Sequence, residues 1–431
     1  MSSESYPETL HLEVTNRCNF ECEVCIRRTW SAKRTDLNID IYNKIAESVF
    51  PQLRRLVICG FGEPFANANL VSMLRTAKEN LPNDSEVILT TNGSLLSPRI
   101  SDKLVGRGLL SDLSFSIDTV DVAKLSRIRK GAKLETILNN LQYVAKARNR
   151  SSNRMSIGVG VVATTENVSE LPKLVKHLSE KQVDYIMMTH VVPYSADILS
   201  RSLFTTLSRR SIEIIASSPK YESLVRPEAA QEILAEASGT HDESGICKAF
   251  KDLWNQLASE GYSANLPMLF NSQKKLEQVK QTEECFAECS RIAREYGLDL
   301  RLPNVYPDAS KRTCPYMEKN ALFIRSDGKV IPCTDFAYKH ESYVNMHGKT
   351  VNELVFGDLM REQLMDIWKR EDYTFFRSHR KKLVDNIPWC GDCPFSTLGC
   401  FFSQTNSRDC YGNEPSCSEC LYSAGLSQCN L

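Results

Sequence analysis

The first half of the chain alternates short apolar segments with longer amphipathic ones. Six segments have the alternation or the apolar runs of β-strands, at residues 11–17, 53–64, 85–93, 112–118, 155–165 and 184–193. The stretches between them have helical periodicity, as at residues 38–49. This spacing predicts an α/β fold with a parallel sheet, whose right-handed crossovers can curl it into part of a barrel.

Polar residues gather at the carboxyl ends of these predicted strands. In residues 112–118 polar and apolar positions alternate, so Ser114, Ser116 and Asp118 form a row on one face. In parallel α/β folds the active site lies at the carboxyl ends of the strands. We therefore expect the functional residues at this edge of the sheet.

Three cysteines follow the first predicted strand, in the loop TNRCNFECEVC. Cys18, Cys22 and Cys25 are spaced to ligate three irons of a four-iron cluster and to leave the fourth iron open. An open iron can bind a small molecule, whereas clusters with four thiolates mainly carry electrons or hold structure. Three close thiols are also compatible with zinc. No fourth cysteine follows before Cys59, which favours the open iron.

Composition narrows the function classes. The 431 residues suggest two or three domains, at a prior of roughly 150 residues each. Lys+Arg and Asp+Glu both number 53, so we expect no nucleic acid partner. The N-terminus lacks the features of a signal peptide, and no apolar run approaches the ~18 residues of a membrane span, so we expect a cytoplasmic protein with no membrane partner. Because stable disulfides need an oxidising compartment, the 16 cysteines argue for metal.

Nine of the cysteines crowd the last part of the chain. Residues 320–325 and 329–333 predict two strands joined by a Ser-Asp-Gly turn, a hairpin that brings the first two of the nine close together. Two four-iron clusters with full thiolate ligation take eight cysteines. One of the nine is therefore spare, or two of them exchange as ligands at one position. Zinc knuckles on the CxxC pairs are the alternative. The nine are Cys314, Cys333, Cys390, Cys393, Cys400, Cys410, Cys417, Cys420 and Cys429.

The stretch between the two cysteine-rich parts is predicted to be mainly helical and carries no motif. Residues 218–230 indicate a linker or the start of an insertion, and residues 273–296 predict a helix that ends at Gly297. Cys285 and Cys289 lie one turn apart on it, a spacing that can hold metal, but an apolar stripe favours their burial as small hydrophobes. The histidines show no HxxxH or HExxH pair, so we expect no histidine metal site.

The cysteine loop after a strand ending in TNRCN resembles the radical S-adenosylmethionine (SAM) superfamily. This resemblance implies a partial, TIM-like (β/α)6 barrel over residues 8–215. It also implies a [4Fe-4S] cluster on Cys18, Cys22 and Cys25, whose open iron chelates SAM. A low-potential donor such as ferredoxin or flavodoxin would supply the electron that cleaves SAM. The resulting 5'-deoxyadenosyl radical would take a hydrogen atom from the substrate.

The resemblance also assigns SAM contacts. The sequence FGEP, with Phe61 as its first residue, resembles the GGEP motif that binds the methionyl amino group, and Ser-x-Asp matches the ribose position. Phe61 replaces a glycine and Val24 replaces an aromatic residue, so we expect altered packing around SAM rather than lost binding. Each match alone has a simpler interpretation, as a turn or a helix cap. The implied SAM-site residues are Gly62, Glu63, Pro64, Asn92, Ser116 and Asp118, with Val162 and residues 189–191 beside the adenine.

The last part, residues 311–431, resembles the SPASM domain, an auxiliary module that typically carries two more [4Fe-4S] clusters, for three in all. Residues 216–310 then form a helical linker or insertion. The resemblance implies an inner cluster on Cys314, Cys333 and Cys410, and an outer one on Cys390, Cys393 and Cys400 with one late cysteine. The gaps of six and nine residues on either side of Cys400 depart from the usual pattern.

The tail DCYGNEPSCSECLYSAGLSQC looks most like radical SAM maturases associated with tungsten-containing aldehyde oxidoreductases. We therefore expect an enzyme that matures a tungstopterin oxidoreductase or its cofactor. The alternatives are modification or crosslinking of a ribosomally made peptide, chemistry on a pterin precursor, and a non-catalytic iron–sulfur electron carrier. No residue is assigned as catalytic acid or base, and Glu13, Asn92 and His190 are candidates for lining the cavity.

Overall fold

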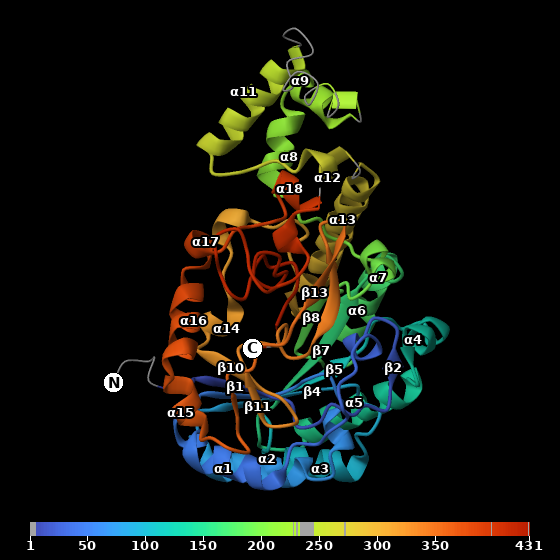
Figure 1. Ribbon diagram of the computed structural model, residues 1–431. Helices are drawn as coiled ribbons and strands as arrows, with labels where there is room; N and C mark the ends of the chain where they lie inside the picture. The colour runs from blue at the N-terminus through green and yellow to red at the C-terminus, as the bar shows by residue number, and fades with distance from the viewer. Residues whose placement is uncertain are drawn as a thin grey trace.

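The computed structural model describes residues 6–226, 228–229, 232, 245–270, 273–397, 399–429 and 431. Within these residues a ten-stranded sheet forms the centre, in the order β14-β11-β10-β1-β3-β4-β5-β7-β8-β9 (Figure 1). The edge strand β9 spans Asp299–Arg301 and runs parallel to β8. Six neighbouring strands run parallel, which confirms the predicted α/β fold with a mostly parallel sheet. They are β1 (Thr9–Leu12), β3 (Arg55–Ile58), β4 (Glu86–Thr91), β5 (Asp112–Ser116), β7 (Ser156–Ala163) and β8 (Tyr185–His190).

Helices join these strands and pack on one face of the sheet, as Figure 1 shows for α1, α2 and α3. Helix α1 begins at Asn38, whose side chain accepts hydrogen bonds from the backbone of Asp40 and Ile41. No helix in the described part of the chain is long and apolar enough to cross a lipid bilayer. The joining helices include α1 (Ile39–Ser48), α2 (Leu70–Asn80), α3 (Pro98–Gly106), α4 (Val122–Ile128), α5 (Leu134–Asn149) and α6 (Leu171–Ser179).

The first strand lies earlier than its polarity pattern predicts. The ladder ends at Leu12 instead of continuing through residue 17. Beyond it Thr15 makes only an isolated bridge to Asp36, whose carboxylate accepts a hydrogen bond from the Thr15 hydroxyl at 2.6 Å. The alternation after Leu12 therefore reflects side chains with partners outside the sheet.

The predicted C-terminal hairpin forms and also extends the sheet. Strands β10 (Ala321–Ile324) and β11 (Lys329–Ile331) pair antiparallel around a turn in which Gly328 has φ +83°. Strand β10 also runs parallel to β1 over its full length, from Thr9↔Ala321 to Leu12↔Ile324. The N-terminal and C-terminal parts of the chain therefore share one sheet, a pairing that the local pattern did not predict.

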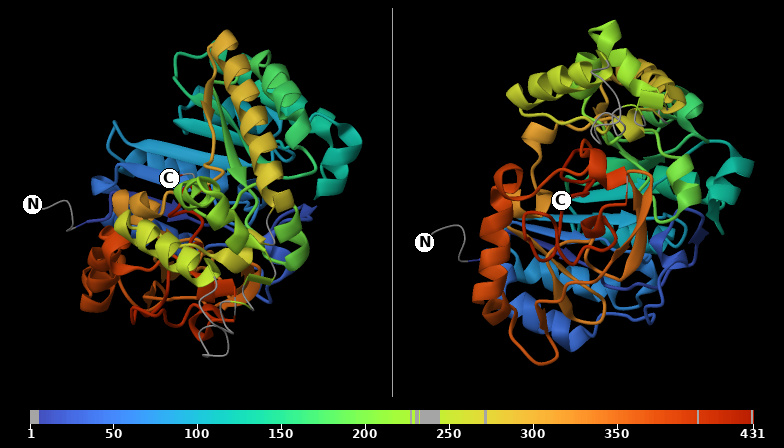
Figure 2. Two further views of the ribbon diagram at one scale, coloured as in Figure 1. Left: turned by 90° about the horizontal axis from the view of Figure 1, so that it is seen from above. Right: turned by 45° about the horizontal axis from the view of Figure 1, so that its top comes forward.

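The middle of the chain is helical, as predicted. Helix α13 spans Gln273–Tyr296 and packs along α6, and Gly297 follows it with φ +66°. Cys289 is fully buried, as its apolar stripe indicated. A separate cluster of helices with its own core lies above the sheet (Figures 1 and 2) and includes α8 (Arg209–Ala216), α9 (Pro219–Glu222), α11 (Gly245–Ser259) and α12 (Leu266–Phe270). Pro227 and Ala230, in the predicted linker, lie outside the described residues.

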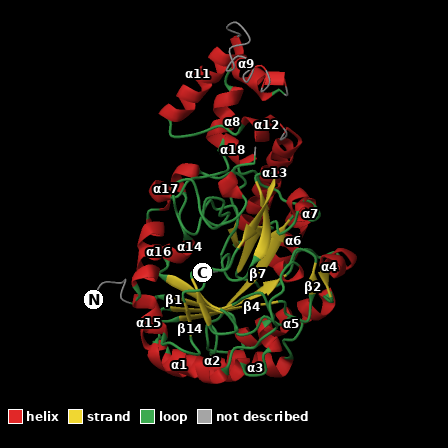
Figure 3. Cartoon of the chain, in the orientation of Figure 1, coloured by secondary structure: helices red, strands yellow, loops and turns green. Residues whose placement is uncertain are grey.

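The cysteine-rich part is mostly loop, drawn green in Figure 3. Helix α15 (Leu364–Lys369) follows β14 (Gly357–Asp358), which pairs with β11. The next helix, α16 (Glu371–Lys381), lies on one side of the cysteine-rich loops. A hairpin of β12 (His340–Val344) and β13 (His347–Val351) lies on their other side. The C-terminus lies near the middle of the molecule in both views of Figure 2.

The side chain of Glu13 joins β1 to both of its neighbours. Its Oε1 accepts a hydrogen bond from Phe61 N at 3.0 Å, and its Oε2 accepts from Ser326 N, the Ser326 hydroxyl and the Tyr338 hydroxyl at 3.2, 3.0 and 2.5 Å. Burial raises the pKa of Glu13, and these donors oppose the rise. Glu13 is fully buried, and both of its carboxylate oxygens accept hydrogen bonds from the protein. It therefore does not line a cavity, contrary to expectation.

Substituting Glu13→Ala should destabilise the whole protein. Four donors would lose their acceptor in a buried place, so we expect the free energy of unfolding to fall by about 3 kcal/mol. Urea denaturation of the anaerobic protein, followed by far-UV circular dichroism, measures this. The control Glu21→Ala removes an exposed carboxylate that pairs with Lys130 on the surface, and its midpoint should stay unchanged. Equal midpoints for the two variants would contradict a joining role.

Candidate functional site

The three loop cysteines lie together at the carboxyl edge of the parallel strands. Strand β2 (Glu21–Cys22) in this loop pairs with β6 (Arg129–Lys130), so Cys22 faces Arg129 across the ladder. The thiols of Cys18, Cys22 and Cys25 are close enough to interact electrostatically. Burial raises the pKa of Cys22 to about 11 and also raises that of Cys25. A bound metal reverses this effect, because it stabilises the thiolate.

Asn92 contacts the cysteine loop. Its Nδ2 donates to Asn19 Oδ1 at 2.9 Å and lies 3.8 Å from Cys18 Sγ, while its Oδ1 accepts from the backbone and hydroxyl of Ser94. The backbone N–H of Phe20 also points at Cys18 Sγ, at 3.4 Å. Asn92, which the resemblance implies as a SAM-site residue, thus has its side-chain amide against a loop thiol.

The carboxylate of Glu63 is used within the protein. Its Oε1 accepts from the Thr91 hydroxyl at 2.6 Å and from Phe65 N at 3.2 Å, and its Oε2 accepts from Asn92 N at 2.7 Å. Burial raises its pKa, which these donors oppose. Glu63 therefore fixes the end of β4.

Gly62 is required by a close backbone approach. A Cβ on it would lie 2.2 Å from the carbonyl oxygen of Thr15 and 2.5 Å from that of Arg17. Pro64 then begins a short 3-10 turn, Pro64–Ala66. The FGEP segment thus lies directly against the chain that leads into the cysteine loop.

Phe61, which replaces a glycine of the motif, belongs to an aromatic cluster. Its ring centroid lies 5.4 Å from that of Trp30 and 5.7 Å from that of Tyr338. The larger side chain is thus accommodated by packing against other rings, and Tyr338 links this cluster to the buried Glu13.

Asp118 holds a buried arginine beside the loop thiols. Arg129 donates to both Asp118 carboxylate oxygens, at 2.6 and 3.0 Å, and Val162 N donates to Oδ1 at 2.8 Å. Burial alone would lower the pKa of Arg129, but Asp118 and the nearby thiols of Cys22 and Cys25 raise it above its ordinary value. Because both Asp118 oxygens are in use, its observed role is to position Arg129, which sequence reasoning missed.

The remaining strand-end residues line the same edge with different exposure. Ser116, Val162 and Thr189 are partly exposed there. Gln428 N, in the C-terminal segment, donates to the Thr189 hydroxyl at 3.0 Å, so this segment lies at the mouth of the barrel. His190 is buried, and burial lowers its pKa to about 3. It therefore does not face this edge of the sheet, although the sequence made it a candidate for lining the cavity.

The C-terminal cysteines form two groups. Cys314, Cys333, Cys417 and Cys420 line one cavity of 60 Å³, and the thiol of Cys429 is close to those of Cys314 and Cys420. Burial raises the pKa of Cys314 to about 11 and also raises those of Cys333, Cys420 and Cys429. Four thiols around one cavity are a donor set for a metal cluster.

The second group contains Cys390, Cys393, Cys400 and Cys410, and burial raises the pKa of Cys390 to about 12. The resemblance implied that Cys410 joins Cys314 and Cys333, but the structure places its exposed thiol near Cys393 and Cys400. The cause is a loop whose base is closed by Ser416 N donating to Asn406 O at 2.7 Å, which carries Cys410 outward.

Buried cations accompany both groups. Arg380 Nε lies 3.4 Å from Cys417 Sγ, and Lys349 lies near Cys390 while it pairs with Glu419 at 3.1 Å. Such donors and charges suit negatively charged iron–sulfur clusters. Among the described residues, no three His, Cys, Asp or Glu side chains converge tightly enough to hold a single metal ion.

Comparison with known proteins decides the family. The Radical SAM superfamily pattern matches residues 12–178, and that of SPASM, an iron-sulfur cluster-binding domain, matches residues 314–394. The chain belongs to the radical SAM superfamily and carries a SPASM domain. The tungsten-containing aldehyde ferredoxin oxidoreductase cofactor-modifying protein of Pyrococcus furiosus is 28% identical over 429 residues, which cover 98% of this chain and 97% of that protein. This radical SAM enzyme therefore uses SAM and iron–sulfur clusters. Its groups of thiols are suitable ligands for such clusters.

Two further proteins are similar at lower sequence identity. GTP 3',8-cyclase of Brucella ovis is 26% identical over 186 residues, and the match covers 42% of this chain and 51% of that one. Streptococcus suis SuiB has the same fold, with a TM-score of 0.53 at 14% identity over 92% of this chain and 73% of that one.

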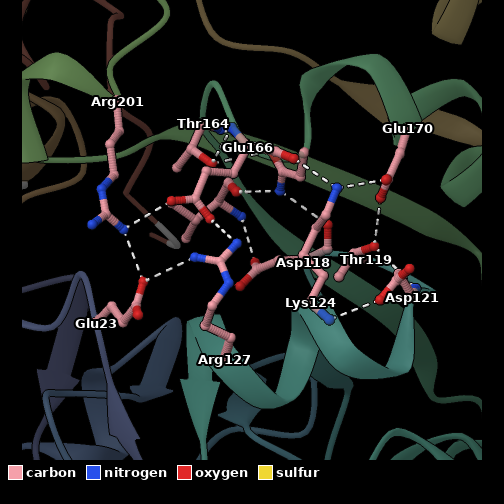
Figure 4. Close-up of polar contacts among 12 residues, drawn as sticks. Glu23, Asp118, Thr119, Asp121, Lys124, Arg127, Thr164, Glu166, Glu170 and Arg201 are labelled. Atoms are coloured by element: carbon pink, nitrogen blue, oxygen red, sulfur yellow. Dashed lines mark hydrogen bonds and ion pairs between the residues drawn. The ribbon is translucent and has the colours of Figure 1, made fainter.

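A ring of four alternating charges holds the cysteine loop of this radical SAM enzyme (Figure 4). Glu23, between Cys22 and Cys25, pairs with Arg201 at 2.8 Å and with Arg127 at 3.7 Å. Glu166, after β7, pairs with Arg201 at 3.0 Å and with Arg127 at 2.6 Å. The hydrogen bond from Arg127 is the main cause that lowers the pKa of Glu166, and the charge of Arg201 lowers it further. These residues are far apart in sequence, so no local pattern identifies them.

Breaking the ring should loosen the loop. Substituting Arg201→Gln removes both of its carboxylate contacts in the ring, worth about 1 kcal/mol, so iron should leave the loop roughly fivefold faster in the presence of a chelator. Anaerobic absorbance of the cluster measures the rate. The control Arg291→Gln removes an arginine paired with Glu288 and Glu295 on the outside of α13. The ring has no positioning role if both variants lose iron at the rate of the unmodified protein.

Proposed function

We propose that this protein cleaves SAM reductively to a 5'-deoxyadenosyl radical and abstracts a hydrogen atom from a substrate during maturation of a tungsten oxidoreductase or its cofactor. The observation that carries the first part is the group of Cys18, Cys22 and Cys25 at the carboxyl edge of the barrel, which leaves one iron of a four-iron cluster without a cysteine. Similarity over nearly the full length to the Pyrococcus furiosus cofactor-modifying protein supports the second part.

When bound, the cluster and SAM together supply the radical chemistry, and the protein supplies binding, orientation and exclusion of water. The backbone at Gly62 to Pro64 and the partly exposed Ser116 are proposed to contact SAM. Arg129 is a cation at the site, held by Asp118 beside Cys22 and Cys25. We assign it to the methionyl carboxylate, because a buried guanidinium pairs well with a carboxylate.

Two auxiliary [4Fe-4S] clusters complete the proposal, for three clusters in all. One is assigned to Cys314, Cys333, Cys417 and Cys420, and the other to the group that contains Cys410. Cys429 is then the ninth thiol, beside the first group. A low-potential ferredoxin or flavodoxin in an anaerobic cytoplasm would supply electrons. Chemistry on a nucleotide or pterin precursor is the second candidate, supported by the partial match to GTP 3',8-cyclase.

Loss of the loop thiols should abolish SAM cleavage. With SAM and a strong reductant, the anaerobically rebuilt protein should form 5'-deoxyadenosine, and the triple variant Cys18→Ala, Cys22→Ala, Cys25→Ala should lower the yield more than about 100-fold. Chromatography quantifies the product. The control Cys247→Ala changes a cysteine on α11 and should keep full yield. Cluster-replete protein that forms no 5'-deoxyadenosine would instead favour the electron carrier.

The two auxiliary groups should respond separately to substitution. Cys417→Ala should release about four irons, and the electron paramagnetic resonance signal of one auxiliary cluster should weaken. Cys410→Ala should weaken the other signal. Iron analysis and spectroscopy on each variant make the comparison, and a loss of the same signal in both would refute this grouping and restore the one that the resemblance implied.

A further inference from the structure

Lys275, on the first turn of α13, is partly buried and forms no ion pair with any residue that the structure describes. Its Nζ donates to the Ser202 hydroxyl at 2.9 Å and to the Ser202 carbonyl. Burial lowers its pKa to about 8, and no charged group in the described part of the chain contributes to the shift. An ammonium has three donors, so one remains for a further acceptor.

The amine lies in the wall of a 700 Å³ cavity. Lys274 and Lys275 line it from α13, the hydroxyls of Ser200 and Thr205 line it from the chain after β8, and Phe204 and Val344 supply apolar walls. Its volume is typical of sites for small molecules. Glu277 is the carboxylate among its lining residues and is exposed, so the cavity carries an excess of positive charge.

A neighbouring cavity of 830 Å³ lacks this imbalance. There Arg209 pairs with Glu283, Arg210 pairs with Glu260, and Lys311 pairs with Asp308. Cations that already have carboxylate partners leave no charge for a ligand to neutralise. The smaller cavity is therefore the stronger candidate for binding an anion.

We propose that the cavity at Lys275 binds the phosphate group of a small molecule whose remaining part is flat and apolar. Lys275 and Lys274 neutralise the phosphate, and the Thr205 hydroxyl donates to another of its oxygens. Phe204 and Val344 contact the apolar part. Binding here does not depend on SAM cleavage, so it stands or falls separately from the proposed function.

Pyridoxal 5'-phosphate is the probe, because it joins a phosphate, a flat ring and an aldehyde. The unprotonated Lys275 amine condenses with the aldehyde to an imine and releases water, and hydride from cyanoborohydride reduces the imine to a stable secondary amine. Peptide mass spectrometry of the anaerobic, cluster-replete protein then locates the label. We expect Lys275 to be labelled first and saturably, and roughly tenfold less by pyridoxal, which has no phosphate.

Competition and variants test the phosphate contact directly. Inorganic pyrophosphate should suppress the labelling. Calorimetry with pyrophosphate should show about tenfold weaker binding for Lys275→Met, near-normal binding for Lys275→Arg, and unchanged binding for Lys280→Met, an exposed lysine on the same helix. Normal cluster absorbance of each variant excludes misfolding.

Three outcomes would overturn the proposal. Label spread evenly over surface lysines would show that Lys275 is not special. Labelling that pyrophosphate does not suppress would remove the phosphate contact. Equal labelling by pyridoxal and its phosphate, with inorganic phosphate bound as tightly as either, would assign the site to a free ion and not to a small molecule.

Discussion

The buried carboxylate of Glu13 is the interaction on which the arrangement of the two cluster-binding parts depends. It accepts hydrogen bonds from the FGEP segment on one side of β1 and from the turn after β10 on the other. Parallel pairing of β1 with both β3 and β10 brings those donors to it. The SPASM domain is thus attached through backbone pairing within the same sheet as the barrel, which fixes the position of its thiols relative to the cysteine loop.

Charge compensation is common to all three thiol groups. Arg129 lies near Cys22, Arg380 near Cys417, and Lys349 near Cys390, and each cation is buried or nearly so. Each also has an anchor of its own within the protein, in Asp118, the carbonyl of Pro415 and Glu419, respectively. Because burial of thiolates is costly, a fixed cation beside each group lowers that cost before a cluster is bound.

The sequence predicted those features that a short window of residues determines. The alternating segments identified the parallel strands, and the Ser-Asp-Gly turn identified the β10–β11 hairpin. Pairing of β10 with β1 could not be predicted, because backbone hydrogen bonds between distant segments leave no local pattern. Asp118 matched a ligand position by spacing alone. Its hydrogen bonds with Arg129 depend on the pairing of β6 with β2, which places Arg129 beside the cysteine loop. Lys275 lies in a polar helix, so the sequence alone predicts that its side chain is exposed to solvent.

The pairing of β1 with β10 also has a consequence for folding. Residues 9–12 find one of their two strand partners more than 300 positions later in the chain. During synthesis the first strand of the barrel therefore remains an open edge, able to pair with another molecule, until the hairpin emerges. Contacts this distant in sequence slow folding. Production of the barrel alone should thus favour aggregation, which a chaperone that covers this edge would reduce.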